Sequence, residues 1–115
     1  MNKVNKLKIS ASYFIQCYNL AIKYTGSSLN QLQIYPIRFN NIVNEQEWKV
    51  AYRSIDLSIR ECKNFTKKNP QYIEDCSLLI TQLSMIKHGM KIILKEEFGL
   101  KPCVHDAEKT VFEHI

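Results

Sequence analysis

Apolar side chains that recur every three or four residues dominate the second half of the chain and predict two long helices. Asn44 is suited to cap the first helix, and Glu47 stands three residues later, where an acid favours a helix start. The apolar face of this helix comprises Trp48, Ala51, Tyr52, Ile55, Ile59, Cys62 and Phe65. The charged residues on the opposite side are Lys49, Arg53, Asp56, Arg60, Lys63 and Lys67. This is the pattern of an amphipathic helix packed on a core.

A second amphipathic helix follows the boundary at Asn69-Pro70. Asn69 can cap this helix and Pro70 suits its first turn, whereas Gly99 is a residue that ends helices. Its apolar face comprises Tyr72, Cys76, Leu79, Leu83, Ile86, Met90 and Ile93. A helix of about 28 residues would be roughly 42 Å long, so we expect a bend near His88-Gly89. We expect the two long helices, joined at Asn69-Pro70, to pack antiparallel.

The first part of the chain predicts one shorter helix, from Ser12 to Tyr24, after a flexible lead-in over residues 1–9. The polar residues that form a narrow stripe along this helix are Ser12, Gln16, Asn19 and Lys23. The helix is therefore apolar nearly all round. Such a helix either lies at the centre of a bundle or is covered by a partner.

Two further segments predict short helical elements. Residues 29–43, which Pro36 interrupts, predict one or two helical turns. Asp106 can cap a last helix over residues Ala107 to His114. The sequence as a whole predicts a single all-α domain over residues 1–115, an irregular helical bundle of about five helices.

Composition places the chain among ordinary globular proteins. Apolar residues make up 45% of the chain and charged residues 23%, which argues against wholesale disorder. The four cysteines form no C-x-x-C pair, and three of them fall on apolar helix faces. The basic N-terminus has no long apolar run behind it, which argues against a signal peptide, and no segment is apolar enough to span a membrane. We therefore expect a cytoplasmic protein.

Candidate catalytic groups are few. Cys103, His105 and Asp106 lie close in sequence, but a nucleophilic cysteine needs a base within hydrogen-bond reach, which sequence neighbours seldom provide. The spacing of His88, His105, His114 and Cys103 is not that of a metal site. No glycine-rich phosphate loop is present either. We expect no enzyme activity, no metal site and no cofactor.

The favoured hypothesis is a non-enzymatic protein-binding module, and within that class a bacterial immunity protein or antitoxin that binds and neutralises a toxin domain. The small size, the scarcity of catalytic groups and the many tyrosines favour protein binding. The formal net charge of +5 opposes association with a cationic toxin, so the contact would use local acidic residues. The candidate partner-binding residues are Tyr13, Tyr18, Tyr24, Glu45, Glu47, Glu74 and Asp75.

Two alternatives remain open, a small basic helical protein associated with nucleic acid and a structural subunit of a larger assembly. Lysines four residues apart line one ridge of the second long helix, and further cations gather at the end of the first. The candidate nucleic-acid residues are Arg60, Lys63, Lys67, Lys87, Lys91 and Lys95. The oligomeric state does not follow from the sequence.

Overall fold

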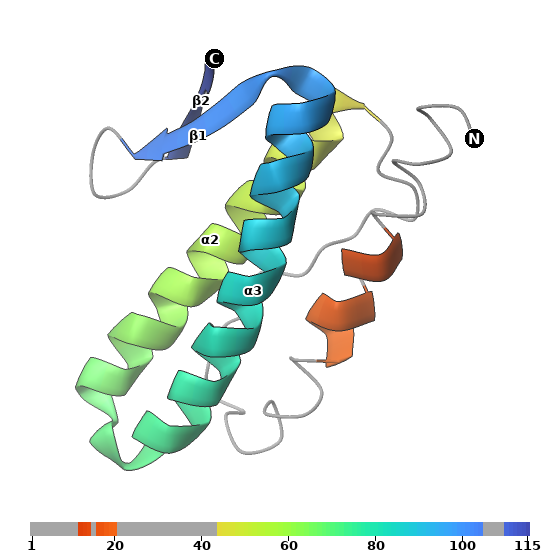
Figure 1. Cartoon of the computed structure of the whole chain (residues 1–115). Helices are drawn as coiled ribbons and strands as arrows, with labels where there is room; N and C mark the ends of the chain where they lie inside the picture. The colour runs from red at the N-terminus through yellow and green to blue at the C-terminus, as the bar shows by residue number, and fades with distance from the viewer. Residues whose placement is uncertain (1–11, 15, 21–43, 105–109) are drawn as a thin grey trace.

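The structure, a computed structural model, describes residues 12–14, 16–20, 44–104 and 110–115 of the chain (Figure 1). Residues 12–14 and 16–20 are helical. The elements that follow are α2 (Glu45–Lys68), the 3₁₀ turn η1 (Pro70–Tyr72), α3 (Ile73–Phe98), β1 (Leu100–Val104) and β2 (Thr110–His114). α2 and α3 lie side by side and antiparallel, and the helical N-terminal residues lie along α3.

Both ends of the helix pair are fixed by the residues that the sequence singles out. The Glu47 amide donates to Asn44 Oδ1 at 2.8 Å, and Asn44 Nδ2 donates to Glu47 Oε1 at 2.6 Å, so Asn44 caps α2. Asn69 differs from the expectation, because its side chain donates to the Phe65 carbonyl and closes the end of α2. Gly99 ends α3 in the left-handed conformation with φ 63°, which a glycine adopts without strain.

The core lies between α2 and α3. α2 buries Trp48, Ala51, Tyr52, Ile55, Ile59 and Cys62. α3 buries Cys76, Leu79, Leu83, Ile86, Met90 and Leu94. These residues belong to the predicted apolar faces, and Leu94 flanks the predicted face of α3. Phe65, Tyr72 and Ile93, which the same pattern places on those faces, are only half-buried. The two sets of buried residues make up most of the buried apolar core in the described part of the chain. Each fully buried leucine or isoleucine contributes about 2 kcal/mol relative to an exposed one.

The N-terminal helical residues pack on this pair through one side only. Tyr18 is buried, and its hydroxyl lies 3.1 Å from Ser58 Oγ. The Ser58 hydroxyl donates to the Ser54 carbonyl, so Tyr18 acts as the donor to Ser58. Burial raises the pKa of Tyr18 from its ordinary value of 10 to about 12. Phe14 packs edge-on against Trp48, with their ring centroids 6.2 Å apart.

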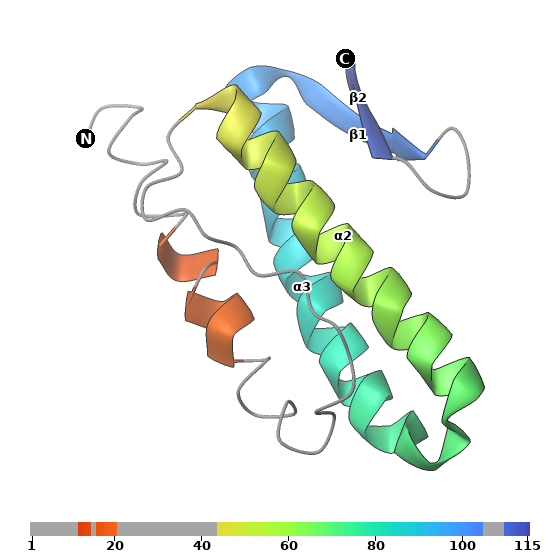
Figure 2. The ribbon, with the colours of Figure 1, turned by 180° about the vertical axis from the view of Figure 1, so that it is seen from behind.

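The prediction of an all-α bundle of about five helices is wrong. Within the described residues there are two long helices. Of the predicted last helix, Ala107 to His114, the residues that the structure describes form the strand β2 (Thr110–His114) instead. β2 pairs antiparallel with β1 (Figure 2). In this register Pro102 lies opposite Phe112. Thr110, Val111 and Phe112 are β-branched or aromatic residues that favour a strand once a partner strand is adjacent.

Other expectations meet the structure only in part. At His88-Gly89, where the sequence predicts a bend, α3 continues as one unbroken helix. The lead-in over residues 1–9, the helical turns expected in 29–43 and the end of the first helix at Tyr24 lie outside the described residues. No helix in the described part of the chain is both long and apolar enough to cross a membrane.

The N-terminal helical residues pack closely on α3 at Gly89, where Phe14 lies against the helix. A methyl group added at Gly89 would lie 2.6 Å from Phe14 Cε1 and 2.7 Å from Phe14 Cζ, so the ring would have to move. We expect Gly89→Ala to lower the free energy of unfolding by about 1 kcal/mol, because the overpacking exceeds the gain in helix propensity. Urea denaturation of the purified protein measures this change.

The same substitution in a Phe14→Ala background should have the opposite sign. With the ring removed, only the helix propensity of alanine remains, and we expect a gain of up to about 1 kcal/mol. Equal effects of Gly89→Ala in the two backgrounds would show that Phe14 does not rest on Gly89.

Candidate functional site

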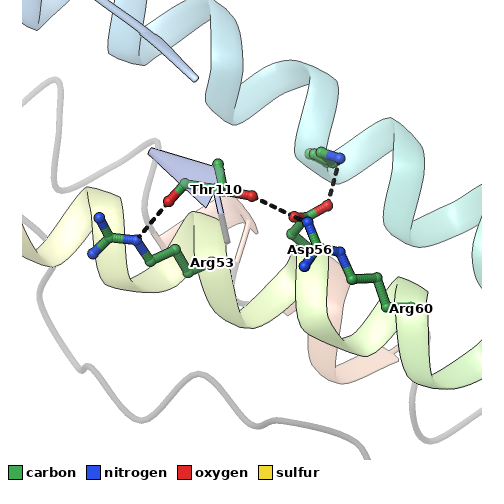
Figure 3. Close-up of polar contacts among 5 residues, drawn as sticks. Arg53, Asp56, Arg60 and Thr110 are labelled. Atoms are coloured by element: carbon green, nitrogen blue, oxygen red, sulfur yellow. Dashed lines mark hydrogen bonds and ion pairs between the residues drawn. The ribbon is translucent and has the colours of Figure 1, made fainter. Parts of the chain in front are cut away.

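A buried carboxylate on α2 gathers polar groups from three elements (Figure 3). The Asp56 side chain is only 8% exposed. Its Oδ1 accepts from Lys87 Nζ of α3 at 2.6 Å. Its Oδ2 accepts from Thr110 Oγ1 of β2 at 2.5 Å and lies 3.1 Å from Arg60 Nη2. Asp56 therefore joins α2, α3 and the hairpin at one point, which we call the Asp56 cluster.

The protonation of Asp56 is set by its neighbours. Burial alone would raise the pKa of the Asp56 carboxyl, but hydrogen bonds from Lys87 and Thr110 outweigh that effect. The charges of Lys87 and Arg60 act in the same direction, and together they hold the pKa below its ordinary value of 3.8. A carboxylate with a lowered pKa and three bound donors is a poor general base, so the cluster is suited to hold structure rather than to move protons.

The hairpin is further fixed by an aromatic contact beside the cluster. The rings of Phe112 and Tyr52 meet edge-on with centroids 5.7 Å apart. The Arg53 guanidinium lies 4.9 Å from the centroid of the Phe112 ring, and its Nε donates to the Thr110 carbonyl at 3.2 Å. Arg53, which the sequence places on a solvent-facing side, is thus half-buried under β2.

A groove of about 500 Å³ lies on the other side of α3, between that helix and the N-terminal helical residues. Its lining consists of Tyr13, Phe14, Cys17, Leu20, Gln82, Met85 and Ile86. Tyr13, Leu20 and Met85 are 61%, 65% and 71% exposed, so large apolar side chains stand at the surface here. Gln82 is the polar residue of this lining, and its Oε1 is buried with no hydrogen-bond partner in the described part of the molecule. We call this surface the apolar groove.

Those predicted partner-binding residues that the structure describes lie in different parts of it and do not form one surface. Tyr13 lines the apolar groove, and its hydrogen bond with Cys17 raises the pKa of Tyr13. Tyr18 is buried against Ser58, and Tyr24 lies outside the described residues. The acidic residues are all in the first turns of helices, where they favour the helix start: Glu45 and Glu47 in α2, and Glu74 and Asp75 in α3.

The predicted nucleic-acid residues are also divided. Arg60 and Lys87 belong to the Asp56 cluster. Lys63 and Lys67 are exposed near the end of α2. Lys91 and Lys95 are exposed on α3 and line a separate cleft with residues of the hairpin. The six cations therefore do not form one surface.

Several residues of these sites are not apparent from the sequence. Asp56 and Thr110 look like ordinary surface and helix residues until the hairpin brings them together. Met85 is an apolar residue that lies off the apolar face of α3, and this position is a usable signal of an exposed apolar side chain. Gln82 and Lys101 carry no local signal, because their role depends on neighbours distant in sequence.

The cysteines and histidines are not grouped around a metal site in the described residues. Cys103 is half-buried on β1, and its thiol lies 3.6 Å from Glu113 Oε2. His105 and Asp106, its predicted partners, lie outside the described residues. All four cysteines are free thiols.

Comparison of the chain with protein-family models, with curated proteins and with solved structures finds no match.

The Asp56 cluster makes stability dependent on pH. The carboxyl has a lowered pKa in the folded chain, so its contribution is present above the ordinary value and is lost as the pH falls through the folded value. We expect Asp56→Asn to lower the free energy of unfolding at pH 7 by about 2 kcal/mol, allowing for the partial exposure of Lys87 and Arg60. The difference from the wild type should shrink towards about pH 3.

Denaturant unfolding at both pH values checks this expectation, with Glu74→Gln as a control for loss of an exposed carboxylate. Hydrogen exchange at the amides of β2 should also speed up in Asp56→Asn, since Thr110 loses its charged partner. A stability difference that does not change with pH would contradict the assigned role of the Asp56 carboxylate.

Proposed function

We propose that this chain is a non-enzymatic protein-binding module that holds an apolar segment of its partner in the apolar groove. The observation that carries the proposal is the exposure of Tyr13, Leu20 and Met85 around a hollow of about 500 Å³. Large exposed apolar side chains gathered in one place are typical of interaction sites, whereas isolated ones are common on any surface.

The chemistry of the groove suits a protein segment. Tyrosine, phenylalanine and methionine are enriched where proteins bind one another, and all three line this surface. An unpaired buried amide oxygen costs about 1–3 kcal/mol, so Gln82 would gain from turning towards a donor that a partner supplies. A strand that buries its apolar face here and turns an unpaired edge N–H towards Gln82 would satisfy both requirements.

The narrower proposal is an immunity protein or antitoxin, with a toxin domain as the partner. It is supported by the size and composition of the chain. We place it in the cytoplasm, where four free cysteines stay reduced. The apolar lining of the groove also removes an electrostatic difficulty, because a contact through Tyr13, Leu20 and Met85 does not require acidic residues against a cationic toxin.

Leu20→Asp tests the groove directly. The partner to test is a toxin-like domain encoded beside the gene for this chain, titrated against the purified protein by calorimetry. We expect the substitution to raise Kd at least about tenfold, because it places a carboxylate in an apolar contact. Co-expression should show the same order, with the wild type restoring growth of cells that express the toxin and the variant failing to do so.

Ile73→Asp is the matched control, since it changes an apolar residue that is 55% exposed on α3 but does not line the groove. It should bind like the wild type. A large loss of thermal stability in Leu20→Asp would show that the groove is covered within the chain itself and would contradict the proposal. Wild-type affinity in Leu20→Asp would do the same.

A further inference from the structure

A cationic cleft lies where the C-terminal half of α3 meets the β hairpin. It has a volume of about 400 Å³. Its basic residues are His88, Lys91 and Lys95 from α3 and Lys101 from β1. The positive charge thus comes from two elements, which distinguishes the cleft from a ridge of lysines along a single helix.

The charge in this cleft is available to a ligand. Lys91 and Lys95 are exposed, and neither forms an ion pair with any residue that the structure describes. No acidic side chain is among the described residues that line the cleft. Glu113 stands opposite Lys101 in the hairpin register, and opposite charges at such a position attract each other. Lys91 and Lys95 lie on α3 and have no acidic residue opposite them in the described strands of the hairpin.

The floor between the cations is apolar. Ile92 is 43% exposed, Pro102 is half-buried, and the buried Leu100 closes the base of the cleft. Cations around an apolar floor match a ligand with a charged backbone and flat uncharged groups. A hollow of about 400 Å³ is of the size that holds one nucleotide and is too small for a duplex.

We propose that this cleft binds the backbone of a single-stranded nucleic acid. Lys91 and Lys95 are four residues apart, about 6 Å along the helix axis, which suits contact with neighbouring phosphates of one strand. Lys101 contacts the strand from the hairpin side, and a base or sugar lies on Ile92 and Pro102. Binding depends on charge and shape and has little sequence preference.

Fluorescence anisotropy of a labelled oligouridine of eight nucleotides tests the proposal with the full chain. We expect a Kd of about 1–100 µM at low salt. Three phosphate contacts predict a slope of log K against log salt of about −2, or a loss of roughly twentyfold between 50 and 200 mM salt. The double variant Lys91→Glu/Lys95→Glu should raise Kd at least about tenfold, and Lys101→Glu alone several-fold.

Lys63→Glu/Lys67→Glu provides the matched control, because it changes the net charge equally at exposed positions on α2. It should raise Kd by less than about threefold. Equal effects of the two double variants would reduce the binding to net charge and overturn the site, as would no binding at 50 mM salt. Tighter binding of inorganic phosphate or of duplex RNA than of the single strand would also overturn it. Unchanged melting curves confirm that the variants are folded.

Discussion

The arrangement of the C-terminal half of this chain depends on one buried carboxylate. Removing a charged group from water is unfavourable by several kcal/mol, and only well-placed donors offset it. Asp56 has three such donors, from Lys87, Arg60 and Thr110, and they come from α3, α2 and β2. A hairpin of two strands is at best marginally stable alone, so its position is set by what it contacts. The contacts at Thr110 and Phe112 with α2 set that position.

The position of the hairpin in turn creates the cationic cleft. β1 leaves α3 through the left-handed turn at Gly99, and the Ile115 amide donates back to the Gly99 carbonyl at 2.9 Å. With β2 held on α2, β1 brings Lys101 close to the lysines of α3. The apolar groove has a different origin, because it depends on the contact of Phe14 with Gly89. α3 therefore lines both the apolar groove and the cationic cleft, and a substitution can disrupt one of them without the other.

The sequence predicts the elements that local rules determine and misses the one that a distant partner determines. The apolar periods of α2 and α3, the cap at Asn44 and the end at Gly99 are local signals, and each is found where it was expected. Residues 107–114 follow an equally plausible helix signal, the acidic cap residue Asp106. The strand forms because β1 offers backbone partners and Tyr52 offers a surface for Phe112, and neither is visible in that segment.

The lysines on α3 point in different directions because of the geometry of the helix. Successive residues turn by about 100° around a helix, so each step of four residues advances the direction by about 40°. Across Lys87, Lys91 and Lys95 the direction changes by about 80°, and the ridge winds from the α2 side towards the surface. Lys87 reaches Asp56, whereas Lys91 and Lys95 line the cleft. Lysines spaced four residues apart therefore predict the helix correctly, but they do not show that all three charges lie on one surface. The charge of Lys87 is engaged by Asp56, so of these three only Lys91 and Lys95 contribute their charge to the cleft.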